Sequence, residues 1–381
     1  MPHSLKTATV YRPEIDGLRM IAVFGVILFH LNSSLLEGGF LGVDVFFVIS
    51  GYLITSIIHR QVEEDRFSLW AFWKRRFMRL YPALLVMVVI TLIAGFLVLP
   101  SPERDILPIQ SIGALFSFSN ILLLNTTGGY WSPAVENIPL LHTWSLSIEE
   151  QFYICFPVFL CLFKKRSGLG IAVLFVVSLL LCLFYSFVHP SYAFFMLHTR
   201  MWELLIGGLL AIASPLIPAF CKSKLTASVI HLIGLGLIFF SYCSIKNKYG
   251  FPGLYPLIPC IGTFLILAIQ SDKSIVTRAL STKAFVHLGK MSYSLYLWHW
   301  PVIVYAYYVS PSPSWGLILL VTFVAATASY YLVEQPIRNA SILPRRPAFA
   351  VVIVLVSSLC VFGVVKKSPL LKPLGNFDDA Y

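Results

Sequence analysis

The amino-acid sequence predicts an all-α, polytopic bundle of membrane helices. Hydrophobic residues make up 58% of the 381-residue chain, charged residues make up only 12%, and the mean hydropathy is +0.82. An ordinary soluble protein carries roughly 25% charged residues. The apolar residues also gather in runs of about 17–20, the length of a helix that crosses a bilayer. Helices are favoured over sheets because an open sheet would leave backbone N–H and C=O groups unpaired in lipid.

Eleven apolar segments are long enough to be candidate spans. They cover residues 17–33, 42–58, 80–99, 146–163, 169–188, 195–213, 227–244, 254–270, 292–309, 315–333 and 348–365. One further segment, Ile106–Leu124, is apolar but contains Ser111, Ser117, Ser119 and Asn120. We expect this segment to be re-entrant or interfacial.

The distribution of Lys and Arg supports that interpretation. Basic residues collect in the cytoplasmic loops of membrane proteins. If Ile106–Leu124 dips into the membrane and returns, and the N-terminus is cytoplasmic, most of the 28 basic residues lie in cytoplasmic loops. A full crossing would move the basic residues of the later loops outside. We therefore predict a cytoplasmic N-terminus and an extracytoplasmic tail, Lys366–Tyr381.

The eleventh span differs from the first ten. It follows a Pro/Arg break, "LPRRP", and contains no charged residue. The first ten spans carry the unusual polar residues. We therefore divide the chain into a working membrane domain, residues 1–340, and a second part, residues 341–381, that holds a linker, the eleventh span and the tail.

Composition argues against several classes of protein. The net charge of +11 could suit a nucleic-acid-binding protein, but the basic residues lie in short loops where membrane topology explains them. The first apolar run is not followed by an A-x-A-like cleavage site, so no cleavable signal peptide is predicted. The seven Cys show neither CxxC nor Cys/His ligand spacing, so we predict no structural disulfide and no metal site.

The first span carries two ionisable residues, in the stretch "GLRMIAVFGVILFH". Arg19 and His30 are separated by close to three helical turns, so they share a face and lie roughly 16 Å apart. Ionisable residues inside a membrane are costly and are functional candidates by default. Asp16, one turn before Arg19, could pair with it. Alternatively, Arg19 extends to the inner headgroups and His30 caps the outer end of the helix.

A basic cluster precedes the third span, in "WKRRFMRLYPAL". It consists of Lys74, Arg75, Arg76 and Arg79. Arginine offers a planar fork that binds phosphate bidentately, so this cluster could hold a donor with several phosphates, such as coenzyme A. The same pattern is typical of a topology signal that contacts anionic lipids, and the sequence leaves both interpretations open.

Further polar residues lie at the edges of later spans. In "LHTWSLSIEEQFY", His142, Ser145 and Glu149 fall on one helical stripe that we expect to enter the membrane from outside. Glu149 could orient a histidine or bind a sugar hydroxyl, or it could satisfy amides in the first helical turn. His299 lies between two Trp in "KMSYSLYLWHWPV", where an aromatic belt is the ordinary explanation. Asp44 is expected near the outer mouth.

Six stretches together give a specific resemblance. They are "YRPEIDGLRMIAVFGVILFH", "GGFLGVDVFFVISGYLIT", "FWKRRFMRLYPALL", "HTWSLSIEEQFY", "SYSLYLWHWPV" and "VEQPIR". In this order, over residues 11–338, the chain resembles the acyltransferase-3 family of membrane acyltransferases, and most of all the bacterial enzymes that O-acetylate lipopolysaccharide O-antigen. The family's R/K-x10-H motif falls on Arg19 and His30, and its short basic motif falls on the Lys74–Arg79 cluster.

The resemblance implies an O-acyltransferase of the bacterial inner membrane. It implies acetyl-CoA as the cytoplasmic acyl donor, no metal, and as acceptor a hydroxyl of a surface glycan or lipid-linked oligosaccharide at the periplasmic face. We assign catalytic roles to His30, Glu149 and Arg19, with His30 as general base or as transient carrier of the acyl group. We assign donor binding to Lys74, Arg75, Arg76 and Arg79. We assign acceptor binding to Asp44, His142, Ser145 and His299. Many long relatives carry an external hydrolase-like domain after the last span, which this sequence does not include.

Two other functions are compatible with the residues. A transporter or acyl-group exporter would also carry His, Arg and Asp inside the membrane, although no pair of inverted halves is evident in the sequence. A membrane anchor or assembly subunit for a partner enzyme is the third possibility, and alanine substitutions at Arg19 and His30 would then be silent.

Overall fold

The structure, a computed structural model, is a bundle of α-helices. It describes residues 11–130, 132–214, 223–246 and 251–339, and these residues form no strand. The first helices are α1 (Pro13–Leu31), α2 (Gly42–Glu63), α3 (Leu69–Val98), α4 (Glu103–Leu115), α5 (Ser119–Thr126) and α6 (Thr143–Leu162). They are followed by α7 (Ser167–Val188), α8 (Pro190–Phe195), α9 (Leu197–Ala213), α10 (Lys224–Ser244) and α11 (Leu257–Ala268). The last are α12 (Ile275–Leu280), α13 (Lys283–Lys290), α14 (Ser292–Val309), α15 (Trp315–Ser329) and α16 (Gln335–Asn339). Short 3-10 turns cover Gly39–Leu41, Pro133–Asn137 and Lys164–Arg166.

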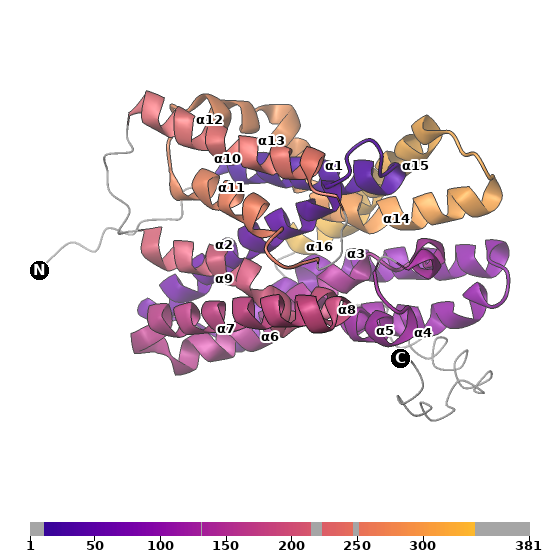
Figure 1. Cartoon of the computed structure of the whole chain (residues 1–381), viewed down its shortest axis with the longest axis horizontal. Helices are drawn as coiled ribbons and strands as arrows, with labels where there is room; N and C mark the ends of the chain where they lie inside the picture. The colour runs from indigo at the N-terminus through magenta and orange to yellow at the C-terminus, as the bar shows by residue number, and fades with distance from the viewer. Residues whose placement is uncertain (1–10, 131, 215–222, 247–250, 340–381) are drawn as a thin grey trace, which may run out of the picture.

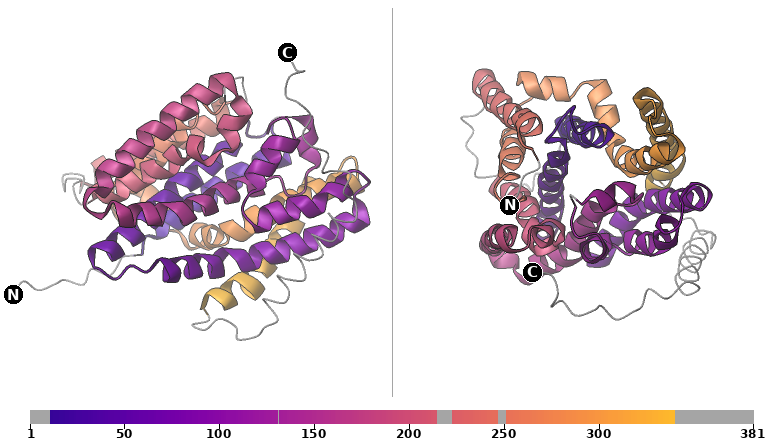
Figure 2. Two further views of the ribbon diagram at one scale, coloured as in Figure 1. Left: turned by 90° about the horizontal axis from the view of Figure 1, so that it is seen from below. Right: turned by 45° about the vertical axis from the view of Figure 1, so that its right-hand side comes forward.

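Helices α1 and α2 form the centre of the bundle. Helix α1 packs against α2, α12, α13 and α14, and α2 packs most extensively against α9. Figures 1 and 2 show α1 and α2, drawn in indigo, between the magenta helices and the orange helices. Helices α7 and α15 lie at the periphery and expose large apolar side chains, as expected of surfaces that contact lipid. The central helices are therefore the ones placed to carry buried polar groups.

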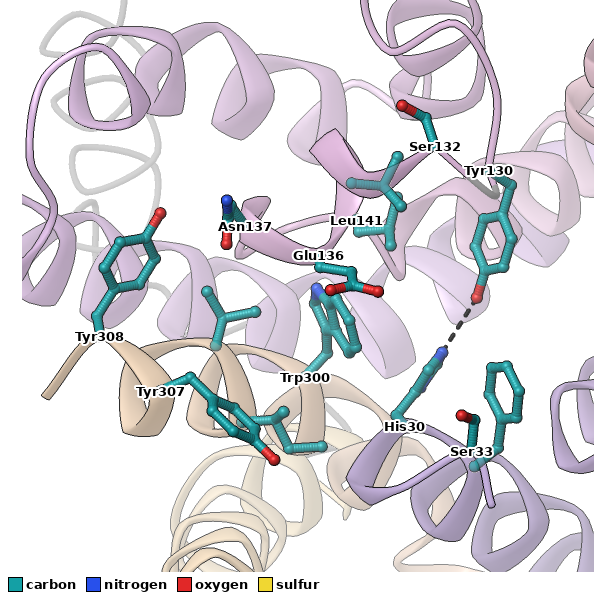
Figure 3. A pocket seen from close by; sticks show the side chains of 14 residues that line it. His30, Ser33, Tyr130, Ser132, Glu136, Asn137, Leu141, Trp300, Tyr307 and Tyr308 are labelled. Atoms are coloured by element: carbon teal, nitrogen blue, oxygen red, sulfur yellow. Dashed lines mark hydrogen bonds between the residues drawn. The ribbon is translucent and has the colours of Figure 1, made fainter. Parts of the chain in front are cut away.

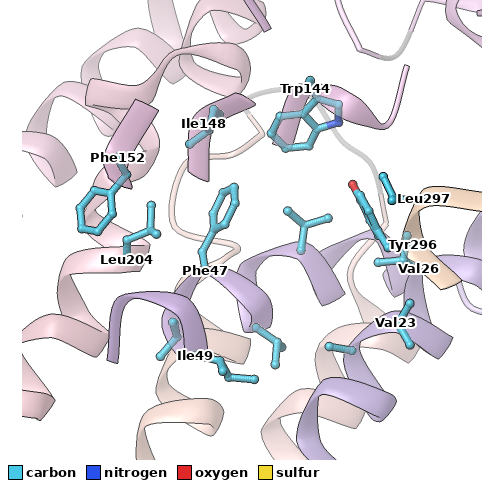
Figure 4. Close-up of a cluster of buried hydrophobic side chains, with 14 of the residues drawn as sticks. Val23, Val26, Phe47, Ile49, Trp144, Ile148, Phe152, Leu204, Tyr296 and Leu297 are labelled. Atoms are coloured by element: carbon cyan, nitrogen blue, oxygen red, sulfur yellow. The ribbon is translucent and has the colours of Figure 1, made fainter. Parts of the chain in front are cut away.

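The core is made where α2 crosses α6 and α9 (Figure 4). Phe47 and Ile49 of α2 are buried there together with Leu204 of α9. A Cβ at Gly51 would come within 1.8 Å of the Leu204 carbonyl oxygen, so this close crossing requires glycine. Small residues at such crossings let membrane helices approach closely, which increases van der Waals contact where lipid offers no hydrophobic driving force.

Six helical segments are long and apolar enough to cross a membrane. They are Gly39–Glu63, Leu69–Val98, Thr143–Leu162, Ser167–Val188, Lys224–Ser244 and Trp315–Arg338. The remaining predicted spans among the described residues correspond to α1, α9, α11 and α14, which are shorter or more polar. The eleventh span, residues 348–365, lies outside the described residues. The protein is thus a multi-pass helical membrane protein, and the count of ten spans plus one stays a prediction.

Helices α4 and α5 form a hairpin that covers the segment Ile106–Leu124, whose re-entrant placement in the membrane stays a prediction. The chain turns at Ser117, which has a φ of 59°. At this turn Gln151, in the middle of α6, donates a hydrogen bond to the Ser117 carbonyl oxygen, and Ser119 bonds to Ser147. The hairpin therefore reaches the middle of α6 and then returns.

Helix α3 is longer than predicted at its N-terminal end. It begins at Leu69, well before residue 80, because Ser68 accepts a hydrogen bond from the Ala71 amide and caps the helix. The basic cluster consequently lies on a helix rather than in a loop. Arg76 and Arg79 are three residues apart and so share a face.

Two irregularities in the last helices position polar groups. Pro301 lies inside α14 and removes one backbone N–H from that helix. After α15, residues Tyr330–Glu334 form a π-helical turn, a feature often found at functional sites. This turn buries Glu334, which accepts a hydrogen bond from Ser294 of α14.

Candidate active site

The structure brings His30 and His299 together. His30, one residue before the end of α1, points its Nδ1 atom at His299 Nε2 on α14, and the two nitrogens are 3.0 Å apart. The rings are stacked, with 14° between their planes. The sequence predicted both as site residues but gave no reason to pair them, because 269 positions separate them along the chain.

Backbone geometry fixes the protons of this pair. His299 Nδ1 lies 2.6 Å from the Tyr296 carbonyl oxygen, which can only accept, so Nδ1 carries a proton. In the neutral ring His299 Nε2 is then an acceptor, and His30 Nδ1 must donate to it. The lone pair of His30 is consequently at Nε2, which is the arrangement of a histidine poised to accept a proton.

The lone pair on His30 Nε2 accepts a hydrogen bond from Tyr130. The Tyr130 hydroxyl lies 3.0 Å from His30 Nε2, on the loop between α5 and α6. Burial raises the pKa of the Tyr130 hydroxyl, so it stays protonated and donates the hydrogen bond. The Trp300 ring lies 4.7 Å from the His30 ring, and its Nε1 donates to the Ile138 carbonyl oxygen. Three contacts therefore hold the His30 ring in one orientation.

His30 lines a cavity of about 540 Å³ (Figure 3), called the outer cavity here because the sequence predicts that this end of α1 faces outside. The other lining residues are Phe29, Ser33, Tyr130, Ser132, Val135, Glu136, Asn137, Leu141, Trp300, Ile303, Val304, Tyr307 and Tyr308. Aromatic residues of α14 form one wall, and the loop before α6 forms the opposite wall. A cavity of this size with a few polar groups is typical of a small-molecule site.

His142 and Ser145 approach the same histidines from α6. The His142 ring lies 5.5 Å from the His299 ring, and among the described residues its nitrogens have no hydrogen-bond partner besides the neighbouring Leu297 carbonyl oxygen. The Tyr296 hydroxyl lies 2.6 Å from Ser145 Oγ and donates to the His142 carbonyl oxygen at 3.0 Å. Tyr296 thus ties α14 to the start of α6, beneath the histidine pair.

A second, inner pocket contains the predicted arginines. Arg19 of α1 and Arg76 and Arg79 of α3 all line it, and its volume is about 80 Å³. Lys290 lines the same pocket. Asp16 lies 3.7 Å from Arg19, so the pairing predicted from their spacing is present. Four cationic side chains converge here from three helices, as an anion-binding site requires.

Glu149 lies in the inner pocket with Arg19, and it does not line the cavity of His30. Its carboxylate accepts a hydrogen bond of 2.8 Å from Ser50 of α2. Lys74 and Arg75 are exposed and do not line the pocket. Of the basic cluster, Arg76 and Arg79 are therefore the residues that the structure brings to Arg19.

Asp44 takes part in a buried ion cluster. Arg200 of α9 pairs with Asp44 of α2 at 2.7 Å and with Glu203 at 3.1 Å. All three side chains are at most 1% exposed, and Phe194 and Phe251 pack against the Arg200 guanidinium. A buried pair stays charged only with such close partners, so the cluster locks α2 to α9 beside the site.

A small third cavity lies between the two pockets. It shares His30 and Tyr130 with the outer cavity, and Val43 and Tyr296 with the inner pocket. Asp44 and Arg200 also line it. The three cavities follow one another along α1, from Arg19 to His30, and the side chains of Val43 and Tyr296 separate the inner pocket from the small cavity.

Comparison with known proteins decides the family. The acyltransferase domain family matches residues 12–334, which include all of these pockets. The chain belongs to this family. O-acetyltransferase OatA of Staphylococcus aureus is 36% identical over 97% of the chain, and a putative O-acetyltransferase of the same species is 36% identical over 89%. The chain spans 65% of the length of OatA and 59% of the second relative. No solved structure matches the chain.

Several residues of this acyltransferase domain escaped the sequence analysis. Tyr130 and Glu136 lie in an irregular loop without periodicity, and Tyr296 is one aromatic residue among many in its helix. Arg200 and Glu203 carried a usable signal, since they are ionisable residues three positions apart inside a predicted span. No lysine or arginine lies near Asp44 in the sequence, so its ion-pair partner, Arg200, could not be predicted.

Proposed function

We propose that the protein is a membrane O-acyltransferase that moves an acyl group, acetyl in the first instance, from cytoplasmic acyl-CoA to a hydroxyl of an extracytoplasmic glycan. The observation that carries this proposal is the succession of an arginine-lined pocket and a histidine-lined cavity along a single helix, α1. One pocket suits a donor with phosphates, and the other suits a reaction that removes a proton. The names of the relatives support acetyl as the transferred group.

The inner pocket would hold the donor. Arg76 and Arg79 would bind phosphate oxygens of CoA, and Arg19, farther along α1, would bind the part nearest the membrane interior. The rise of the helix puts Arg19 and His30 roughly 16 Å apart. The long, flexible thiol arm of CoA would therefore extend past Tyr296 and Val43 to bring the thioester to His30.

The outer cavity would hold the acceptor. An acceptor hydroxyl would replace the Tyr130 hydroxyl on His30 Nε2, which takes its proton as the oxygen attacks the thioester carbonyl carbon. A C–O bond forms, the C–S bond breaks, and His30 returns the proton to the departing thiolate. His299 accepts a hydrogen bond from His30 throughout and holds the ring in the reactive tautomer.

The proposed location rests on the distribution of charge along the sequence. The distribution of basic residues supports a cytoplasmic N-terminus, with the Arg19 end of α1 inside and the His30 end outside. In a bacterium this corresponds to the inner membrane, with a periplasmic acceptor such as lipopolysaccharide O-antigen or a lipid-linked oligosaccharide.

The test uses the full chain purified into lipid nanodiscs, isotopically labelled acetyl-CoA and a glycan prepared from the native host. We expect His30→Ala to lower the transfer rate by about 10²–10⁴-fold, the usual contribution of a general base. His59→Ala is the matched control, because His59 lies on α2 and pairs with Glu63 outside all three cavities. Equal rates for the two variants, at equal protein levels, would contradict the proposal.

A further inference from the structure

The charge of the outer cavity restricts what can bind there. Among its lining residues in the described part of the chain there is one carboxylate, Glu136, and neither Lys nor Arg. This contrasts with the inner pocket, where four cationic side chains outnumber two carboxylates, Glu149 and Glu334. A negatively charged group in the outer cavity would face Glu136 without a cation to offset the repulsion.

Glu136 is positioned to bind a ligand. It lies in the 3-10 turn Pro133–Asn137, on the wall opposite α14, and it makes no hydrogen bond or ion pair within the described residues. Figure 3 shows its carboxylate directed toward the space between Trp300 and His30. An exposed carboxylate at this point can accept hydrogen bonds from a molecule that also reaches His30.

The opposite wall offers flat apolar surfaces. Trp300, Tyr307 and Tyr308 line the cavity from α14. The hydrogen bond from Trp300 Nε1 to Ile138 fixes the indole ring, so it forms a rigid platform. Aromatic faces combine apolar contact with polar edges, which suits a ring that has apolar C–H faces and hydroxyl groups around its rim.

From these observations we propose that the outer cavity binds a sugar ring that carries no negative charge beside the reacting hydroxyl, with Glu136 accepting a hydrogen bond from a second hydroxyl or an amide N–H of the ring. This inference rests on the proposed function and narrows its acceptor. Glu136 would then help to select the acceptor. Asn137 and Ser132, on the same wall, would make further polar contacts with it.

The test measures binding without a donor, so it does not depend on catalysis. The full chain in nanodiscs is titrated with two probes, the methyl glycoside of N-acetylglucosamine, which is neutral, and methyl glucuronoside, which is anionic. Ligand-observed NMR gives each dissociation constant. We expect the neutral probe to bind about 10-fold or more tightly than the anionic one, because like charges at close range are strongly unfavourable.

Substitutions that change the charge at Glu136 test whether this residue causes the preference for the neutral probe. Glu136→Gln should reduce the preference for the neutral probe, and Glu136→Lys should reverse it. Glu37→Lys makes the same charge change outside the cavity, where Glu37 pairs with the exposed Lys246, and should keep the wild-type preference. The proposal is overturned if the anionic probe binds as tightly as the neutral one, if Glu136→Lys and Glu37→Lys behave alike, or if the neutral probe shows no saturable binding.

The outcomes for the two proposals are separate. Selective binding of the neutral probe by a protein that transfers no acyl group would overturn the proposed function alone. Acyl transfer to anionic and neutral acceptors at equal efficiency would overturn only the assignment of Glu136.

Discussion

The outer cavity and the inner pocket of this protein differ in how their polar groups are arranged. The outer cavity centres on a chain of directional hydrogen bonds that runs from the Tyr296 carbonyl through His299 and His30 to Tyr130. The inner pocket collects positive charge from α1, α3 and α13, with Arg19, Arg76 and Lys290 among its lining residues.

This difference indicates which changes each region should tolerate. A hydrogen-bonded chain fails when a member that fixes the tautomer of the next ring is removed, as His299 does for His30. A cluster of cations loses affinity in steps, since several charges act on the same anion and salt screens each of them. The expected effects therefore differ in kind as well as in size.

The largest effect should come from breaking the scaffold that both regions share. Arg200→Ala removes the cation between Asp44 and Glu203 and leaves two buried carboxylates, which should cost about 3–5 kcal/mol of folding free energy. Thermal unfolding in nanodiscs measures this. Arg278→Ala, on the exposed side of α12, is the control and should unfold like the wild type. A stable Arg200→Ala protein would show that the cluster does not hold α2 to α9.

A smaller effect is expected when the histidine chain is cut at its second member. His299→Ala leaves His30 Nδ1 without its acceptor, so a fraction of His30 adopts the wrong tautomer. We expect kcat to fall about 10–100-fold, as for other residues that orient a functional histidine, with the KM for acyl-CoA unchanged. Steady-state kinetics with labelled acyl-CoA separate the two constants. An increase in KM alone would place His299 in donor binding instead.

The inner pocket should respond through affinity. Arg76→Ala removes one charge-assisted contact, which is worth about 1.5–3 kcal/mol, so the KM for acyl-CoA should rise about 10- to 150-fold while kcat changes little. Arg76→Lys should recover part of the loss. The exposed Arg75 provides the comparison on the same helix, and Arg75→Ala should raise KM by a smaller factor. Equal effects of the two alanine variants would mean that surface charge, rather than the pocket, binds the donor.

The smallest effect, in the opposite direction, is expected at Tyr130. Tyr130→Phe removes the hydroxyl that occupies His30 Nε2, so the acceptor no longer has to displace a hydrogen bond worth about 0.5–1.5 kcal/mol. The KM for the acceptor should fall about 2–10-fold. Titration of the acceptor at saturating acyl-CoA measures this change. A strong loss of activity would instead show that the hydroxyl takes part in the reaction.

Much of the fold follows from hydrophobic patterning, and the structure shows where that signal weakens. The most apolar spans, α7 and α3, are visible in the sequence because lipid demands a continuous apolar surface. Helices α1, α9 and α14 give weaker signals because they carry the buried polar groups. A low hydropathy within a predicted span therefore indicates that the helix carries polar residues of the site.

The candidate site was accessible from the sequence only one helix at a time. Spacing along α1 predicted the pairing of Asp16 with Arg19, which is present, because both residues belong to the same turn. The contact of His30 with His299 and that of Asp44 with Arg200 depend on how separate helices pack. Patterns within one segment contain no information about those distances.

The proline in α14 has a consequence for its neighbours. Pro301 has no N–H, so the carbonyl oxygen of Leu297, one turn earlier, lacks its partner within the helix. The His142 ring lies beside this carbonyl, and His142 is a histidine whose nitrogens have no other partner among the described residues. Without its amide partner, the Leu297 carbonyl oxygen is an unpaired acceptor in an apolar interior. A ring N–H of His142 can donate to it. Replacing Pro301 would return the amide that pairs with the Leu297 carbonyl oxygen within α14. The substitution should therefore disturb His142, which directly precedes α6.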